Sequence, residues 1–474
     1  MAIEKQSEVK WGSLLLCLAI GLTLWLIPEP AGLEPDAWQL FSIFVATIIA
    51  LVIKPIPMGS TAILALTFIV LTKTLTLEQS LSGFQNTTIW LIVIAFFISR
   101  GFIKTGLGTR ISYLFVWLFG KKTLGLSYSM LLSDLILAPA MPSNTARAGG
   151  IIFPIIRSLS ETYDSRVGDG TERRVGAFLV KVSFQGDMIT SAMFVTAMAA
   201  NPLAVQITKE ITGETITWGG WALAALVPGL ISLALIPLVI YKLYPPELKE
   251  TPKAATIATQ KLDEMGKLKK TEWYMIGVFV LLLALWIFGG SIGLGATESA
   301  FVGLSVLLLS GVLTWSDIKK EQGAWDTLVW FAVLVMMATY LNELGMIPWF
   351  SDLMGNAVSQ LSWTLTLVIL AIVYFYSHYF FASNTAHVSA MYAAFLSVIV
   401  AAGAPPLLSA LILAFFSNLF GSLTHYGAGP APVFFGSGYI SQQKWWMLGF
   451  IISVIHIIVW FGVGGLWWKV LGLW

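Results

Sequence analysis

The sequence predicts an all-α polytopic membrane protein, with about eleven transmembrane helices and two re-entrant hairpins arranged as an inverted repeat. Three observations predict this fold class. Of 474 residues, 57% are hydrophobic and only 11% are charged, whereas about a quarter of the residues in a soluble domain are charged. Apolar segments recur from Trp11 to Leu473 with short polar breaks. The tetrapeptide Ser-Asn-Thr-Ala occurs twice, each time in the middle of an apolar stretch.

The number of predicted helices follows from the apolar segments. A spanning helix needs about 20 mostly apolar residues, and hydropathy and helix breakers divide the chain accordingly. The predicted spans are residues 11–28, 37–54, 58–73, 87–104, 175–201, 218–243, 272–290, 298–316, 325–345, 405–423 and 445–472. The polar stretches 157–174 and 244–272 are too short to bury a core of their own, so we expect loops there.

Composition also excludes several classes of function. A net charge of +2 gives no indication of nucleic-acid binding. The one cysteine, Cys17, allows neither an internal disulfide nor a cysteine metal cage. We therefore expect no metal and no cofactor, and the partners we expect are small anions and the lipid bilayer.

Two further apolar stretches, 124–157 and 360–402, are interrupted in the middle and are predicted to enter and leave the membrane on one side. The positive-inside rule supports this topology. With the N-terminus cytoplasmic and the C-terminus external, most lysines and arginines lie in cytoplasmic loops. The external loops hold only Lys209 and are residues 29–36, 74–86, 202–217, 291–297 and 346–360. We expect a multi-pass protein of the cytoplasmic (inner) membrane.

A lysine-rich cytoplasmic linker, residues 244–271, separates two halves of the chain, 1–243 and 272–474. Each half contains one interrupted hairpin with Ser-Asn-Thr-Ala at its centre, at 143–146 and 383–386, which are 240 residues apart. The first hairpin is predicted to open to the cytoplasm and the second to the outside, so the repeat is inverted.

Each half also contains a later polar break within an apolar run, from Thr196 to Pro202 in the first half and from Ser422 to Pro430 in the second. Paired interruptions at corresponding positions are the best sequence indication of a transporter's binding site. Non-helical backbone at membrane depth is tolerated only where it is buried in protein or lines a wet cavity.

The residues around the first motif suit a helix that begins inside the membrane. Pro139 and Pro142 end one half-helix, and Ser143 caps the next. The positive end of that next helix points at the tip, where a carboxylate is the natural occupant. Two such tips favour a substrate with two acid groups. A lone Ser-Asn-Thr equally fits the cap of a kinked helix, and the second copy lacks flanking prolines; the duplication favours a binding site.

The candidate substrate-binding residues are the two tips, the residue two positions after each motif threonine, and parts of both later breaks. They are Ser143, Asn144, Thr145, Ser383, Asn384, Thr385, Arg147, His387, Ala200, Asn201, Pro202, Thr424, His425, Tyr426 and Gly427. For His425 and Tyr426, lining the site and ordinary packing are both open.

With these motifs the chain resembles the divalent anion/sodium symporter (DASS) superfamily over essentially its whole length. The run Ser-Asn-Thr-Ala-Arg-Ala-Gly-Gly at 143–150 is similar to the branch of plastid 2-oxoglutarate/malate translocators and bacterial dicarboxylate and citrate exchangers. The resemblance implies a homodimer in which each protomer has a scaffold and a mobile domain carrying both hairpins, moving as an elevator. The expected substrates are of the 2-oxoglutarate, malate, fumarate and succinate class.

Arg147 and His387 occupy equivalent places in the two repeats, where sodium-coupled relatives have small or neutral residues. A guanidinium and an imidazole there could replace the charge of bound sodium, which favours sodium-independent exchange. The alternative is structural: Arg147 bonds a backbone carbonyl or Asp134, and His387 is a neutral core histidine. Asp187, an acid inside a predicted span, is open to a transport role or to pairing across helices. We expect His456 to be a core histidine bonded to a neighbour.

Three other functions remain as alternatives. Sodium-coupled symport of di- or tricarboxylates uses the same fold. An anion channel needs weak sites or charged rings, whereas two capped tips suggest a closed site. An intramembrane hydrolase would use Ser383 or Ser377 with His378 or His387, but no acidic partner is evident. We therefore predict a transporter and not an enzyme.

Overall fold

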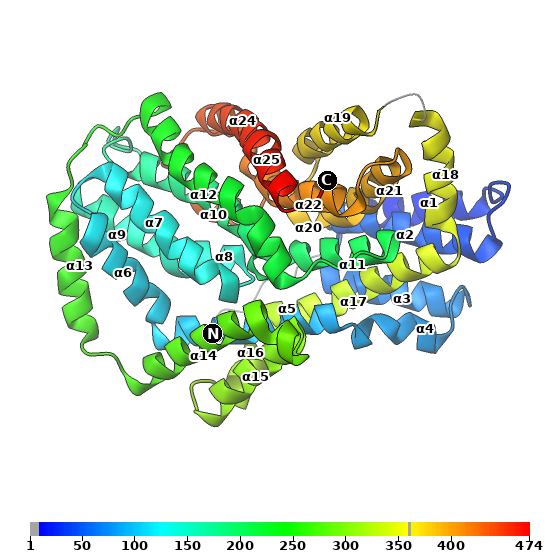
Figure 1. Cartoon of the computed structure of the whole chain (residues 1–474), viewed down its shortest axis with the longest axis horizontal. Coiled ribbons are helices and arrows are strands. Elements are labelled where there is room, and N and C mark those ends of the chain that lie inside the picture. The colour runs from blue at the N-terminus through cyan, green and yellow to red at the C-terminus, as the bar shows by residue number, and fades with distance from the viewer. Residues whose placement is uncertain (1–8, 359–361) are drawn as a thin grey trace.

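The computed structural model describes residues 9–358 and 362–474, and almost every element in them is a helix (Figure 1). Within these two ranges there is no β-strand, only one isolated bridge between Lys122 and Glu250. Nine of the described helices are long and apolar enough to cross a membrane. The predicted all-α membrane fold is confirmed.

Each of the eleven predicted spans coincides with a helix. These helices are α1 Trp11–Leu26, α2 Pro35–Ile53, α3 Met58–Leu71, α5 Thr87–Thr105, α10 Gly176–Met193, α12 Trp218–Leu243, α14 Lys270–Phe288, α15 Ala296–Leu309, α17 Gln322–Glu343, α22 Pro406–Leu419 and α24 Gln442–Ile458. Four of them, α1, α3, α15 and α22, belong to shorter apolar segments of 10–17 residues. The number of crossings therefore stays a prediction.

Among the described residues, four helices of more than ten residues lie mainly outside the predicted spans and hairpins. They are α6 Leu107–Phe119, α11 Ala200–Thr212, α13 Pro252–Met265 and α18 Met346–Val358. The loop expectations for 202–217, 244–272 and 346–360 are wrong to this extent. In α13, Pro252 occupies the first turn, and Ala254 and Ala258, four residues apart, are buried on the face that packs on α6. The predicted second hairpin begins at residue 360, which lies outside the described residues, as do residues 1–8.

Both interrupted stretches fold as helix, break, helix. The first consists of α7 Thr123–Leu137, the 3₁₀ turn η2 Ala138–Ala140, α8 Asn144–Arg147, the π-helical turn η3 Ala148–Ile152 and α9 Phe153–Thr162. The second consists of α19 Trp363–Tyr376, η6 Ser377–Phe380, α20 Asn384–His387, η7 Val388–Tyr392 and α21 Ala393–Ala401. In Figure 1, α7 runs inward to α8 and α9 returns beside it.

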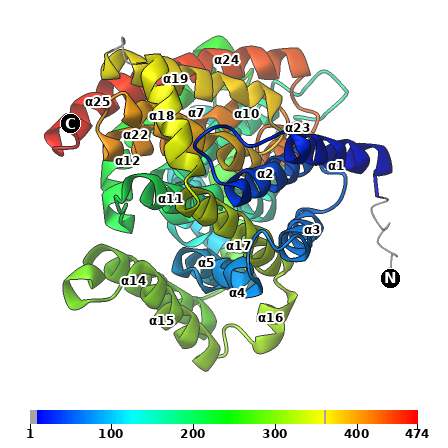
Figure 2. The ribbon, with the colours of Figure 1, turned by 90° about the vertical axis from the view of Figure 1, so that its right-hand side faces the viewer.

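The helices form two bodies. In Figure 2, α14, α15 and the short α16 (Trp315–Lys320) lie at the bottom, while α10, α19 and α24 lie at the top. The first body packs α1, α2, α3, α5, α14, α15 and α17 together. The second body packs both hairpins with α10, α12, α22 and α24. Both tips lie where the bodies meet, because η2 contacts α5 and α20 contacts α2.

Helix α10 is the centre of the second body. All of its 18 residues are buried, and it contacts α7, α9, α12 and α22. This explains how a membrane helix tolerates Lys181 and Asp187: protein, not lipid, surrounds them. The outer helices instead expose large apolar side chains, such as Phe288 (68% exposed) and Leu309 (89% exposed), as expected for surfaces that face lipid.

Candidate substrate site

The first tip has the predicted capped geometry. The backbone is extended at Met141 (φ −127°, ψ 91°), which lies between Pro139 and Pro142. The Ser143 hydroxyl accepts a hydrogen bond from the Ala146 N–H (3.1 Å), and the Asn144 side-chain oxygen accepts one from the Thr145 N–H (2.9 Å). Ser143 therefore acts as the N-cap of the helix that begins at Asn144.

The second tip forms the same break without prolines. Phe381 (φ −117°, ψ 133°) and Ser383 (φ −163°, ψ 131°) are extended, and the Ser383 hydroxyl caps the Ala386 N–H at 3.4 Å. Among the described contacts, none supplies an acceptor for the backbone N–H of Asn384 or Thr385. These amides, at the positive end of a helix, are suited to an anion.

The two hairpins match element by element. Four α-helical residues follow each cap serine, and a five-residue π-helical turn follows them, at 148–152 and at 388–392. Short π-helical turns inside α-helices often mark functional sites. Corresponding turns 240 residues apart agree with an internal repeat of the Ser-Asn-Thr-Ala motif.

The second break lies between the two tips. A Cβ built on Gly429 would lie 2.2 Å from the Thr145 hydroxyl of the first tip. A Cβ built on Gly421 would lie 3.0 Å from the Asn384 side-chain nitrogen of the second tip and 3.0 Å from the Ala428 Cβ. One short segment thus touches both tips, and its glycines allow the close approach.

The first break is joined to α22, the helix before the second break, by a pair of asparagines. The Asn201 side-chain nitrogen donates to the carbonyls of Ser191 (2.8 Å) and Phe194 (3.0 Å), which satisfies the backbone at the end of α10. The Asn201 oxygen accepts from the side-chain nitrogen of Asn418 on α22 (2.7 Å). Asn418 is not among the predicted site residues, although an asparagine inside an apolar run is a signal that can be read from the sequence.

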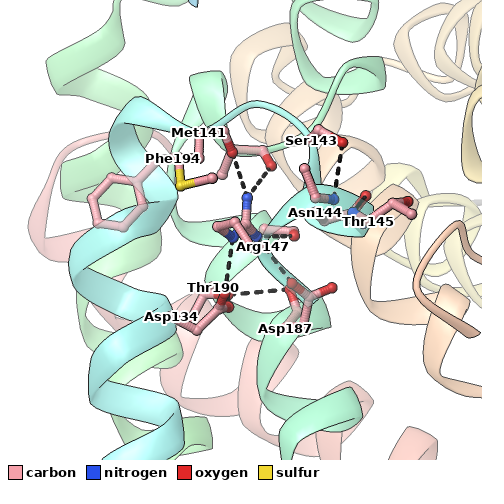
Figure 3. A network of polar contacts seen from close by, with 12 residues as sticks. Asp134, Met141, Ser143, Asn144, Thr145, Arg147, Asp187, Thr190 and Phe194 are labelled. Atoms are coloured by element: carbon pink, nitrogen blue, oxygen red, sulfur yellow. Dashed lines mark hydrogen bonds and ion pairs between the residues drawn. The ribbon is translucent and has the colours of Figure 1, made fainter. Parts of the chain in front are cut away.

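Arg147 is fully buried and every N–H of its guanidinium is bonded (Figure 3). Its Nε donates to Asp134 Oδ1 (2.9 Å), and Nη2 donates to Asp187 Oδ1 (3.2 Å) and Ser191 Oγ (2.8 Å). Its Nη1 donates to the carbonyls of Met141 (2.6 Å) and Ala197 (2.7 Å). A guanidinium has five N–H donors, so all are used.

The contacts of Arg147 are those of the structural alternative. Its charge is compensated by two carboxylates, and Thr190 also bonds Asp134 (Figure 3). Asp187 pairs across helices with this arginine. The guanidinium ties α7, α8, α10 and the break after α10 into one unit, so it fixes the shape of the first tip.

The other predicted residues fall into two groups. Ser143, Thr145, Ser383 and Thr385 keep part of their surface exposed, whereas Asn144, Asn384, Ala200, Asn201, Pro202, Thr424, Gly427 and His387 are buried. His425 and Tyr426 make packing contacts: the Trp446 Nε1 donates to His425 Nδ1 (2.9 Å), and the Tyr426 hydroxyl donates to the Tyr379 carbonyl (2.8 Å).

His387 is buried beside a second histidine, His378, which lies in the turn η6 between α19 and the second tip. His456 is also buried, but neither of its ring nitrogens has a hydrogen-bond partner among the described residues. The expectation of a bonded neighbour for His456 is therefore wrong.

Comparison with known proteins agrees with the resemblance that the motifs indicate. A family model described as "Sodium:sulfate symporter transmembrane region" matches residues 8–474. The putative malate transporter YflS of Bacillus subtilis is 68% identical over 470 residues, covering 99% of this chain and 98% of that protein. The chloroplastic dicarboxylate transporter 1 of Spinacia oleracea is 51% identical over 463 residues, covering 97% and 81%.

More distant relatives extend the comparison. The L-tartrate/succinate antiporter of Shigella sonnei is 36% identical over 485 residues, covering 98% of this chain and 99% of that protein. The solved structures of the YdaH transporter of Alcanivorax borkumensis and of MtrF of Neisseria gonorrhoeae share the fold, with TM-scores of 0.57 and 0.60. Each is 11% identical, and they cover 97% and 96% of this chain and 97% of their own chains. The protein is therefore a multi-pass membrane transporter that belongs to the sodium:sulfate symporter family, within the DASS superfamily.

Proposed function

We propose that the protein exchanges small dicarboxylates across the cytoplasmic membrane, with substrates of the 2-oxoglutarate, malate, fumarate and succinate class. The observation that carries this proposal is the pair of capped helix starts, both touched by the segment from Gly421 to Gly429. Each tip offers a serine and a threonine hydroxyl and the positive end of a helix to one carboxylate. The printed names of the relatives, which include malate, dicarboxylate and tartrate/succinate transporters, support this substrate class.

The residues proposed to contact the substrate are Ser143, Asn144 and Thr145 at the first tip and Ser383, Asn384 and Thr385 at the second. Backbone from Thr424 to Gly427 completes the site between them. We propose that Arg147 and Asn201 hold the first tip and the first break in place without contacting the substrate, because their polar groups are bonded to protein. Ala200 and Pro202 shape the first break.

The hydrogen bonds of Arg147 support sodium-independent transport. Carboxylate, hydroxyl and backbone carbonyl oxygens are the ligands that hard cations take. At the first tip, Oδ1 of Asp134, Oδ1 of Asp187, the Ser191 hydroxyl and the carbonyls of Met141 and Ala197 already bind the guanidinium. Of these two carboxylates, only Asp187 Oδ2 has no partner among the described residues. A sodium ion in their midst would have to displace a buried, fully bonded side chain.

Sodium-coupled symport is the second candidate, and a specific observation favours it. Near the second tip, the side-chain oxygens of Asn384, Asn418, Ser422 and Thr424 are buried and have no partner among the described residues. Buried polar atoms are normally bonded. These oxygens suit a bound cation, a water or a substrate hydroxyl group.

The two-body arrangement supports an elevator mechanism. Both hairpins belong to the second body, and both tips face the first body, through η2 on α5 and α20 on α2. Sliding of the second body along the first would carry the site from one side of the membrane to the other. We propose that the first body forms a homodimer interface, so that it stays fixed during this motion.

Counter-flow in proteoliposomes tests the proposed function. Vesicles loaded with malate should take up labelled 2-oxoglutarate without sodium. The rate of uptake should saturate with 2-oxoglutarate concentration, and unlabelled succinate and fumarate should inhibit it. Vesicles loaded with buffer alone should take up little. Uptake into buffer-loaded vesicles that needs a sodium gradient would instead establish symport, and non-saturable flux would indicate a channel.

A further inference from the structure

Two buried histidines form a hydrogen-bonded pair directly behind the second tip. Their Nδ1 atoms are 2.9 Å apart, and neither side chain of His378 or His387 is exposed. The rings lie side by side in nearly parallel planes, with an interplanar angle of 9°. Phe420 stacks on both rings, with centroids 3.9 and 4.4 Å away, and Phe381 stacks on His387 at 4.3 Å.

The contacts of the pair fix where its protons lie. His378 Nε2 is 2.9 Å from the Gly427 carbonyl, which can only accept, so this nitrogen carries a proton. In a neutral His378 the Nδ1 is then bare and accepts from His387 Nδ1–H. This arrangement uses one proton on His378 and one on His387.

The remaining nitrogen, His387 Nε2, has a place for a further proton. It is 3.2 Å from the Ser377 hydroxyl oxygen, and that hydroxyl can donate its one hydrogen either to Nε2 or to the Tyr374 carbonyl (2.9 Å). When it donates to the carbonyl, the Ser377 oxygen can accept from a protonated His387 Nε2. A proton on Nε2 would complete the hydrogen bonds of the pair and give it a charge of +1.

The surroundings make this charge dependent on an anion. A buried cation without a counter-charge is costly, and two aromatic faces offset only part of that cost. Among the described residues, no Asp, Glu, Lys or Arg forms a hydrogen bond or ion pair with either ring. The carboxylates of the first tip are bonded to Arg147. The groups that face the pair are Tyr374 and Ser377 from α19 and η6, Tyr392 behind Tyr374, Phe420, Phe381 and the Gly427 carbonyl.

The histidine pair is connected to the proposed substrate site at two points. His387 lies one helical turn after Asn384, and His378 holds the carbonyl of Gly427 in the segment between the tips. We propose that the His378–His387 pair binds one proton together with the dicarboxylate, so that a proton is the co-ligand at the second tip. This proposal rests on the proposed dicarboxylate site.

Proton binding of this kind has a measurable linkage. A carrier that takes up one proton with each dianion binds more tightly as pH falls. As pH rises, the apparent dissociation constant for the dianion rises about tenfold per pH unit. This holds over the pH range in which the complex carries the proton and the empty carrier does not. Uptake occurs on whichever side the site faces, so each exchange step carries the proton with its substrate.

Calorimetric titration of the purified full-length protein with fumarate tests the proposal. Both carboxyls of fumarate are ionised at neutral pH, so its own protonation does not contribute. Titrations at equal pH in two buffers with different heats of ionisation give the number of protons taken up. Between about pH 6 and 8, we expect this number to approach one. Binding without proton uptake throughout this range would overturn the proposal, whereas absence of binding to every dicarboxylate would overturn the proposed function as well.

Variants locate the proton. His387→Asn and His378→Asn should bind fumarate without proton uptake, while His456→Asn, a buried histidine of α24, should keep the wild-type number. Proton uptake that persists in a folded His378→Asn/His387→Asn double variant would place the proton outside the pair, on a group such as Asp187 or Asp134, and contradict the proposal. If that variant does not fold, absence of proton uptake by the wild-type protein still overturns the proposal.

Discussion

Arg147 is the residue whose role changes most between sequence and structure. As an intramembrane arginine beside a duplicated motif, it is easily recognised from sequence, and so is the acidic Asp187. The sequence left two roles open for Arg147, a charge at the tip or a bond to a backbone carbonyl or Asp134, and the contacts are those of the second. The pairing with Asp187 was not predicted, because α8 and α10 meet only when the hairpin packs on α10.

Substitution of Arg147 should destabilise the protein as well as abolish exchange. Arg147→Met leaves two carboxylates buried without their cation, and breaking a buried ion pair costs about 3–5 kcal/mol. We expect a clear fall in the thermal midpoint of the detergent-solubilised protein. The triple variant Arg147→Met, Asp134→Asn, Asp187→Asn should recover most of this stability, since it removes the buried charges together. A single variant as stable as the wild type would refute this account.

Gly429 should be intolerant of even one added methyl group. In Gly429→Ala, the new Cβ would lie 2.2 Å from the Thr145 hydroxyl, so the second break or the first tip must move. We expect KM for dicarboxylate exchange to rise by about tenfold, a loss of about 1.4 kcal/mol in binding. Gly277→Ala is the matched control, because nothing lies within 4 Å of a Cβ there. Equal KM values for the two variants would argue against contact between break and tip.

At the scale of elements, the apolar pattern predicted the long helices and the duplicated motif predicted both breaks. Helix α13 was not predicted because its buried face consists of two alanines, Ala254 and Ala258. Their side chains are too small to make the hydropathy of this segment differ from that of a polar loop. Helix α10 was predicted as a span from its apolar residues. The sequence did not predict that protein surrounds it on all sides, which is why its polar residues are tolerated. Packing of this kind cannot be read from one segment at a time.

The cap of α20, which begins at the second tip, should matter differently from the cap at the start of α19. Ser383 caps α20 and Ser362 caps α19, each through a 3.4 Å hydrogen bond. Replacement by alanine should cost about 1 kcal/mol of stability in either case. Only Ser383→Ala removes a proposed substrate ligand, so only that variant should raise the KM for exchange. A similar rise in Ser362→Ala would mean that the effect is structural.

At the scale of the whole molecule, the 240-residue repeat sets the architecture. Each half contributes a hairpin with the same sequence of cap, helical turn and π-helical turn. The two hairpins share one body and direct their tips at the other. The sequence could predict the repeat, but not which helices group into each body, because that depends on contacts between distant segments.

Labelling of introduced cysteines should confirm the predicted orientation. Cys17 is the one natural cysteine, so in a Cys17→Ala background only the introduced cysteine can react. A membrane-impermeant maleimide added to intact cells should label Ser291→Cys, in a predicted external loop. It should not label Lys253→Cys, in the cytoplasmic linker, until the cells are opened. The opposite pattern would invert the topology.

The most direct test of the account is a structure of the reconstituted protein with a bound dicarboxylate. We predict that one carboxylate lies within hydrogen-bonding distance, about 3 Å, of the first tip at Ser143 to Thr145. The other carboxylate should lie equally close to Ser383 to Thr385. A diacid bound elsewhere, or one that touches a single tip while its second carboxylate faces solvent, would contradict the claim that the two tips share one substrate.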